Sequence, residues 1–146
     1  MSFNLTKIAP MKLYCYILII NVLLYSCDTK EDFIQEVYVN ENIDLSLPIY
    51  SDISITGNSV FIPGGVEGII IYHCIGNDYK AYDRNCSVEP SLACSRIDSV
   101  NAGIAYCGCC PAAFLISNTG EAIHHAQLPL RSYYCILNNN ILTITN

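Results

Sequence analysis

Cysteine is the residue type with the greatest chemical potential in this sequence. The chain of 146 residues contains nine cysteines. Five of them form two clusters, with Cys86 and Cys94 in the first and Cys107, Cys109 and Cys110 in the second. Thiolates at such densities bind metal ions or iron–sulfur clusters, and thiols form disulfides in oxidising compartments. The sequence therefore predicts an oxidising compartment or a metal site.

Short apolar or alternating runs, separated by turn signals, surround the two clusters. They predict strands over residues 42–47, 60–62, 66–75, 79–82, 113–116, 131–137 and 141–145, and a short hairpin over 97–106 between the clusters. No window has the 3.6-residue period of an amphipathic helix. We therefore expect an all-β fold, a small sandwich or barrel of antiparallel strands with two cysteine-bearing loops at one end.

The N-terminal segment has the pattern of a secretory signal. Lys12 precedes an uncharged run, Leu13 to Tyr25, that is too short for a membrane-spanning helix of about 20 apolar residues. The run ends in Leu24-Tyr25-Ser26-Cys27, which resembles the lipobox of bacterial lipoproteins. The resemblance implies a signal peptide over residues 1–26 and an acylated Cys27. It also implies an outer-membrane lipoprotein of the cell envelope, facing the periplasm or the cell surface.

Behind the anchor we expect an acidic tether over residues 27–40 and a single domain over 41–146. The sequence of residues 28–32, Asp-Thr-Lys-Glu-Asp, resembles signals that export lipoproteins to the cell surface. The net charge of −6 becomes more negative once Lys7 and Lys12 leave with the signal peptide. An acidic chain lacks the basic face that nucleic-acid binding requires. The expected partners are the membrane, through the lipid anchor alone, and an unidentified protein.

The domain resembles the Rieske [2Fe–2S] family over about residues 42–146. That family carries Cys-x-His in a first loop and Cys-x-x-His in a second. Ala81-Tyr82-Asp83-Arg84-Asn85-Cys86 matches the approach to the first loop, and Cys107-Gly108-Cys109-Cys110-Pro111-Ala112-Ala113-Phe114 takes the frame of the second. The resemblance implies a Rieske-like β domain whose loops face each other.

The ligand positions of the family are only partly conserved in this chain. Cys86 and Cys107 occupy the cysteine positions, and Val88 and Cys110 occupy the histidine positions. One iron of a Rieske cluster takes the two cysteines and the other takes the two histidines. Valine cannot bind a metal, so a complete ligand set is absent. We therefore expect a domain that has lost its cluster and binds no cofactor.

Without a cluster, the resemblance implies disulfides between the two loops. One would join Cys86 to Cys107 or to Cys110. Cys109 matches a position that forms a second interloop disulfide in some family members, and Cys94 is its available partner. In this interpretation the protein is not an enzyme, and its stapled loops have a structural or binding role.

Three alternatives assign chemistry to the same cysteines. An electron-transfer protein would hold a [2Fe–2S] cluster on Cys86, Cys107, Cys110 and either Cys94 or Cys109, because all-cysteine ligation of such clusters exists. A structural zinc would take four of these thiolates, although only one of the usual two paired knuckles is present. A thiol–disulfide protein would use Cys107-x-x-Cys110, although no helix pattern follows this motif to lower the pKa of a thiol.

The remaining histidines and cysteines are weaker candidates for metal ligands. His124 and His125 are adjacent, and neighbouring side chains of a strand point to opposite faces, so both cannot easily bind one metal. We interpret them as a surface turn pair. His73 lies in a buried apolar run and reads as a core histidine. Cys74 and Cys135 lie on predicted strands and either pair across the sheet or remain small buried apolar residues. We identify no catalytic residue, because no Ser/His/Asp order, phosphate loop or carboxylate pair is present.

Overall fold

The computed structural model describes residues 34–146; the predicted signal peptide and Cys27 lie outside the described residues. The elements are β1 (Asn40–Asp44), η2 (Pro48–Ser54), β2 (Ser59–Ile62), β3 (Ile69–His73), β4 (Tyr79–Asp83), β5 (Ile97–Asn101), β6 (Ile104–Cys107), β7 (Ala113–Leu115), β8 (Glu121–His124), β9 (Ser132–Asn138) and β10 (Ile141–Thr145). The element η2 is a short 3-10 helix. Within this part of the chain, no helix has the length and apolar character to cross a membrane. The all-β prediction is confirmed.

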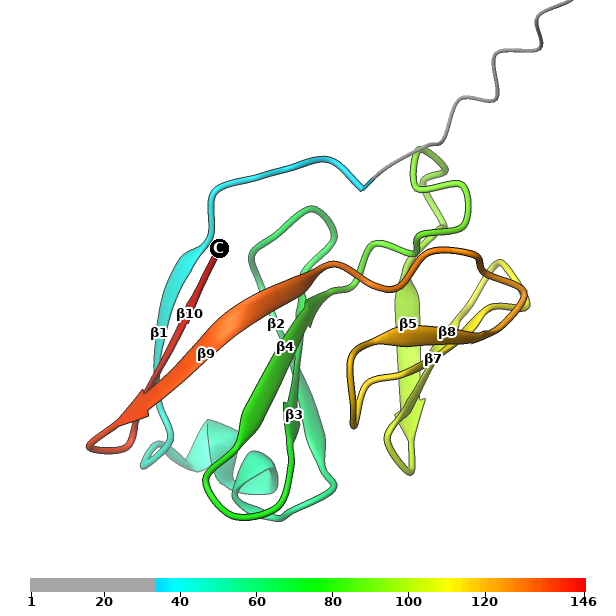
Figure 1. Ribbon diagram of the computed structural model, residues 1–146. Helices are drawn as coiled ribbons and strands as arrows, with labels where there is room; N and C mark the ends of the chain where they lie inside the picture. Colours follow the sequence, from blue (N-terminus) through cyan, green and yellow to red (C-terminus); the bar gives the residue numbers. More distant parts are fainter. Residues whose placement is uncertain (1–33) are drawn as a thin grey trace, which may run out of the picture. The chain divides into compact units, whose positions relative to one another are not determined.

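The strands form two antiparallel sheets. The larger has the order β1-β10-β9-β4-β3-β2, and the smaller has the order β5-β6-β7-β8. Strands β4 and β9 pair directly, with Ala81 opposite Tyr133 and Tyr82 opposite Ser132. The smaller sheet is therefore an excursion of the chain that leaves the larger sheet at β4 and returns to it at β9 (Figure 1).

Strand β3 is buried on both faces, as its continuous apolar run predicts. Successive side chains of a strand point to opposite faces. Ile69 and Ile71 accordingly belong to one apolar core with β1, β9 and β10 residues. Ile70 and Tyr72 belong to a second core, which also contains Cys86. The cysteine site is thus built onto the second core, on the face of β3 that packs with residues of the smaller sheet.

The structure differs from the sequence-based expectation at three elements, β1, η2 and β8. The strand predicted over residues 42–47 ends at Asp44, whose carboxylate accepts the backbone N–H of Ser46 at 2.9 Å. The 3-10 helix η2 follows, with Pro48 at its start and Ile53 buried. The third difference is β8, since the sequence predicts no strand over residues 121–124; one of its four side chains is half-buried and the other three are exposed.

The predicted tether over 27–40 overlaps the packed part of the chain. Residues 34–39 have no regular secondary structure, yet Ile34 and Val39 are buried. The backbone N–H of Val39 donates to Oδ1 of Asn146 at 3.0 Å. The amide of Asn146 in turn donates to the carbonyl oxygen of Val37 at 2.6 Å. The last residues before β1 are therefore bound to the last residue of the chain.

Gly120 in the β7–β8 turn provides a stability test of the contact between the sheets. Its φ is +73°, and an added Cβ would lie 2.5 Å from Cε1 of Tyr82 on β4. Gly120→Ala is therefore expected to lower the free energy of unfolding by about 2–4 kcal/mol, from overpacking and left-handed strain together. Gly76→Ala is the matched control, because Gly76 has a φ of +76° but nothing within 4 Å of its added Cβ. Urea unfolding should give about 1 kcal/mol for the control, and equal losses in the two variants would contradict the packing account.

Candidate thiol site

Two loops carry four of the five clustered cysteines, and Cys107 is the last residue of strand β6. Loop 1, residues 84–96, connects β4 to β5, and loop 2, residues 108–112, connects β6 to β7. Loop 1 closes on itself, because the backbone N–H of Cys86 donates to the carbonyl oxygen of Ser95 at 2.8 Å. The backbone N–H of Gly108 donates to the carbonyl oxygen of Arg96 at 3.3 Å, which joins the two loops at their bases.

A disulfide between Cys94 and Cys109 joins the two loops covalently. Their Cα atoms are 5.7 Å apart, within the usual range for a disulfide. Both residues are exposed, so the bond lies at the surface of the site. This is the second interloop pairing that the family resemblance implies.

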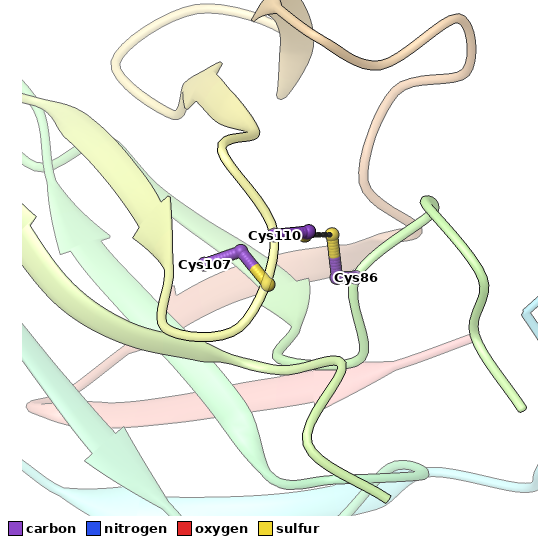
Figure 2. A group of neighbouring side chains, drawn as sticks. All are labelled: Cys86, Cys107 and Cys110. Carbon is purple, nitrogen blue, oxygen red and sulfur yellow. Dashed lines mark hydrogen bonds between the residues drawn. The ribbon is translucent and has the colours of Figure 1, made fainter. Parts of the chain in front are cut away.

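Three further cysteines converge between the two loops. The Sγ atoms of Cys86, Cys107 and Cys110 all lie within 4.8 Å of one another. Figure 2 shows the side chain of Cys86 from loop 1 meeting that of Cys110 from loop 2, with Cys107 beside them. Cys86 is fully buried, and the other two are half-buried. These three residues form what we call the thiol triad.

All three members of the thiol triad are free thiols in the structure. The expected disulfide from Cys86 to Cys107 or Cys110 is therefore not formed. The Sγ atoms of Cys86 and Cys110 are 3.3 Å apart, which is a non-bonded contact, because a disulfide requires about 2.05 Å.

Backbone N–H groups of the loops favour the charged form of each sulfur in the triad. The N–H of Val88 acts to lower the pKa of Cys86, and the N–H of Ala112 acts to lower the pKa of Cys110. The N–H groups of Cys109 and Cys110 act in the same direction on the pKa of Cys107. Loops 1 and 2 thus provide a set of fixed dipoles directed at the three sulfur atoms, which favours negative charge there.

The three thiols have different proton affinities. Burial raises the pKa of Cys86. Burial also raises the pKa of Cys110, and the hydrogen bonds that its thiol donates to Cys107 and Cys86 raise it further. Burial acts in the same direction on Cys107, but hydrogen bonds from Cys110, from two backbone N–H groups and from Cys86 outweigh it, so the pKa of Cys107 is lowered. Cys107 is therefore the member of the triad that loses its proton first.

A buried carboxylate fixes the start of loop 1. Oδ2 of Asp83 accepts the hydroxyl of Tyr133 at 2.6 Å and the backbone N–H of Val66 at 2.7 Å. Oδ1 accepts the N–H of Asn85 at 2.7 Å and that of Glu67 at 3.3 Å. Asp83 is fully buried, and it joins β4, the turn before β3, loop 1 and β9. Burial and the bond to Asp83 both raise the pKa of Tyr133, so its hydroxyl remains a donor.

The donor set of the site does not fit a [2Fe–2S] cluster. Such a cluster takes four protein ligands, and the described residues bring together three. Val88, where the family resemblance implies a ligand, packs its aliphatic side chain against the second core. Cys94 and Cys109 are occupied by their disulfide. The same count excludes a structural zinc with four protein ligands while this disulfide is intact.

The other sequence candidates lie away from the thiol triad. His73 is buried, with Nε2 2.8 Å from the carbonyl oxygen of Gly76. His124 and His125 are exposed at the end of β8, with their ring centroids 4.4 Å apart. These histidines belong to no group of potential metal ligands among residues 34–146.

Cys74 and Cys135 are both free and half-buried in the structure. The thiol of Cys74 lies 3.9 Å from the carbonyl oxygen of Ser117, a weak hydrogen bond. Burial raises the pKa of Cys135 to about 12, which keeps this thiol protonated near neutral pH. Of the two expectations for these residues, the structure shows the one in which they remain thiols packed against the cores.

Comparisons with known proteins add a likeness of fold. No family model and no curated protein matches the sequence. One similar solved chain comes from the complex of reduced oxygenase and oxidized ferredoxin in carbazole 1,9a-dioxygenase. It has 10% identity and a TM-score of 0.49, covering 76% of this chain and 94% of that one. The ferredoxin of carbazole 1,9a-dioxygenase from Nocardioides aromaticivorans IC177 has 12% identity and a TM-score of 0.44, covering 62% of this chain and 86% of that one.

Identities of 10% and 12% transfer no activity to this chain. The fold and the site define a class of protein: an all-β domain in which a disulfide joins two loops and three further thiols converge.

Proposed function

We propose that this chain is a lipid-anchored protein of the bacterial cell envelope, with a Rieske-type β domain that holds no iron–sulfur cluster. Its loops, stapled by Cys94 and Cys109, serve as a rigid surface for a protein partner. The N-terminal lipobox pattern supports the anchor and the outer-membrane location. The convergence of Cys86 from loop 1 with Cys107 at the end of β6 supports the Rieske-type domain.

The observation that carries this proposal is the donor set of the site. Three thiols converge where a cluster would need four ligands, and the fourth position is a valine. Two other loop cysteines are bonded to each other and are unavailable as ligands. A site of this composition supports a stapled structural and binding module better than an electron-transfer centre.

Chemical analysis of the isolated protein tests the proposal. The full chain, extracted from membranes with detergent, is expected to be colourless, with iron and inorganic sulfide far below one equivalent per chain. Unreduced peptide mapping should recover the Cys94–Cys109 pair in the same sample. Absorption between about 400 and 600 nm with about two irons and two sulfides per chain would overturn the proposal in favour of electron transfer.

The lipid anchor has its own test. Cys27→Ala is expected to abolish incorporation of a labelled fatty acid and to release the protein from the membrane fraction, because two acyl chains are needed for stable anchoring. Cys15→Ala is the matched control, since it removes the other N-terminal cysteine and leaves Leu24-Tyr25-Ser26-Cys27 unchanged. Equal fatty-acid labelling of the two variants would contradict the lipoprotein assignment.

Thiol–disulfide exchange is a second candidate function, and the 3.3 Å contact between Cys86 and Cys110 favours it. In such a reaction these two thiols would form one disulfide, release two protons and pass two electrons to a disulfide of a partner protein, which becomes two thiols. The motif Cys107-x-x-Cys110 is followed by Pro111 and strand β7, so no helix N-terminus activates it. Incubation with oxidised glutathione tests this candidate: a Cys86–Cys110 disulfide found by peptide mapping supports it, and three alkylatable triad thiols contradict it.

A further inference from the structure

We propose that Cys86, Cys107 and Cys110 form a mononuclear site for one soft metal ion, and that Cu(I) is the ion whose coordination the site fits. The inference rests on the proposed function, since it requires that no iron–sulfur cluster occupies these residues. The ion would be bound by three thiolates between the two loops that the Cys94–Cys109 disulfide joins.

The spacing of the three sulfur atoms matches three-coordinate binding. All lie within 4.8 Å of one another, and the Cys86–Cys110 pair is at 3.3 Å. Three thiolates around one ion, with metal–sulfur bonds of about 2.3 Å, lie about 4 Å from one another. Small side-chain shifts therefore bring all three sulfurs to bonding distance of a single central ion.

The loop backbones are already arranged for thiolate ligands. The N–H of Gly108 donates to the carbonyl oxygen of Arg96 at 3.3 Å, and the Cys94–Cys109 disulfide joins the same two loops, so the positions of Cys86 and Cys110 are fixed before an ion binds. The backbone N–H groups of Val88, Cys109 and Ala112 act on Cys86, Cys107 and Cys110 in the direction that favours a thiolate.

The surroundings select the kind of ion. No imidazole or carboxylate joins the triad to form a larger ligand group within residues 34–146. Structural zinc sites take four protein ligands, whereas three soft thiolates suit Cu(I). The triad shares the second core with Val88, Ala112 and Ala126, whose apolar side chains supply no further donor.

The charge balance of binding is simple. Three thiols release three protons, and one monovalent ion enters, so the occupied site carries a net charge of −2. The backbone N–H groups on the three sulfurs offset part of this charge. The ion in turn removes the cost of three adjacent thiolates at the edge of an apolar core.

Anaerobic titration of the full chain with Cu(I), in competition with a chromophoric Cu(I) chelator, tests the site. Ascorbate keeps the copper reduced, and peptide mapping verifies the Cys94–Cys109 bond. About one Cu(I) per chain is expected, with three sulfur ligands at about 2.3 Å by X-ray absorption. Serine at Cys86, Cys107 or Cys110 should lower the affinity more than about 100-fold, because loss of even an outer-shell partner costs about 10–100-fold.

Cys74→Ser and Cys135→Ser are the matched controls, since both remove a half-buried free thiol outside the triad. Their Cu(I) affinity is expected to equal that of the unaltered chain. Equal losses in triad and control variants, no stoichiometric binding, or preferential binding of Zn²⁺ would each overturn the inference. Iron and sulfide in the isolated protein would instead overturn the proposed function, so the two failures are distinguishable.

Discussion

Replacement of both Cys94 and Cys109 by serine is expected to lower the free energy of unfolding by about 3 kcal/mol. The disulfide closes a loop with a sequence separation of 15, and in the chain-entropy model a loop of this length contributes about 3 kcal/mol by restricting the unfolded chain. The double variant is preferable to a single one, because a single variant would leave the former disulfide partner as an additional free thiol that can exchange. Urea unfolding of the full chain, monitored by far-UV circular dichroism, measures the loss.

A reductant provides the internal control for this prediction. No other disulfide joins cysteines in residues 34–146, so a reductant should destabilise the unaltered protein and leave the double variant unchanged. If the unaltered protein and the variant unfold at the same urea concentration, the two loops are not held together by this bond.

Asp83→Ala is expected to be the most destabilising substitution near the site, with a loss of roughly 3–5 kcal/mol. The carboxylate is fully buried and accepts four hydrogen bonds. Its removal leaves the Tyr133 hydroxyl and the N–H of Asn85 in the interior without an acceptor, and each unsatisfied buried group costs about 1–3 kcal/mol. Because the N–H of Asn85 lies one residue before Cys86, we also expect faster alkylation of Cys86 in this variant.

Tyr133→Phe is the matched control for the Asp83 prediction. It removes one of the four donors and leaves the three backbone N–H bonds to the carboxylate in place. Its loss should be about 1.5–3 kcal/mol, the usual value for a hydrogen bond to a charged group. An Asp83→Ala variant no less stable than Tyr133→Phe would show that the carboxylate does not organise loop 1.

The sequence predicts those parts of the fold that depend on local pattern. The continuous run through Ile69, Ile70 and Ile71 indicates a doubly buried strand, and β3 is that strand. Strand β8 is not predicted, because Glu121–His124 has no apolar face. Its pairing with β7 follows from the turn at Gly120, which returns the chain to that strand. The 3-10 helix η2 depends on Pro48 and on the burial of Ile53, neither of which produces a periodic pattern.

The sequence likewise predicts only part of the site. The spacing of the cysteines predicts two clusters, and the family resemblance implies the pairing of Cys94 with Cys109. Whether Cys86 and Cys110 are bonded or merely in contact depends on differences of about 1 Å in tertiary packing, which sequence cannot specify. The sequence does not predict the role of Asp83 either, because its hydrogen-bond partners Val66 and Tyr133 lie 17 and 50 residues away along the chain.

Anaerobic reconstitution tests the central claim, that the donor set of this domain cannot hold a [2Fe–2S] cluster. The full chain, with the Cys94–Cys109 bond intact, is incubated with ferrous iron and sulfide and then desalted. The account predicts a colourless protein that retains neither element, because only Cys86, Cys107 and Cys110 are available as ligands. Recovery of about two irons and two sulfides per chain, with absorption between about 400 and 600 nm, would contradict it.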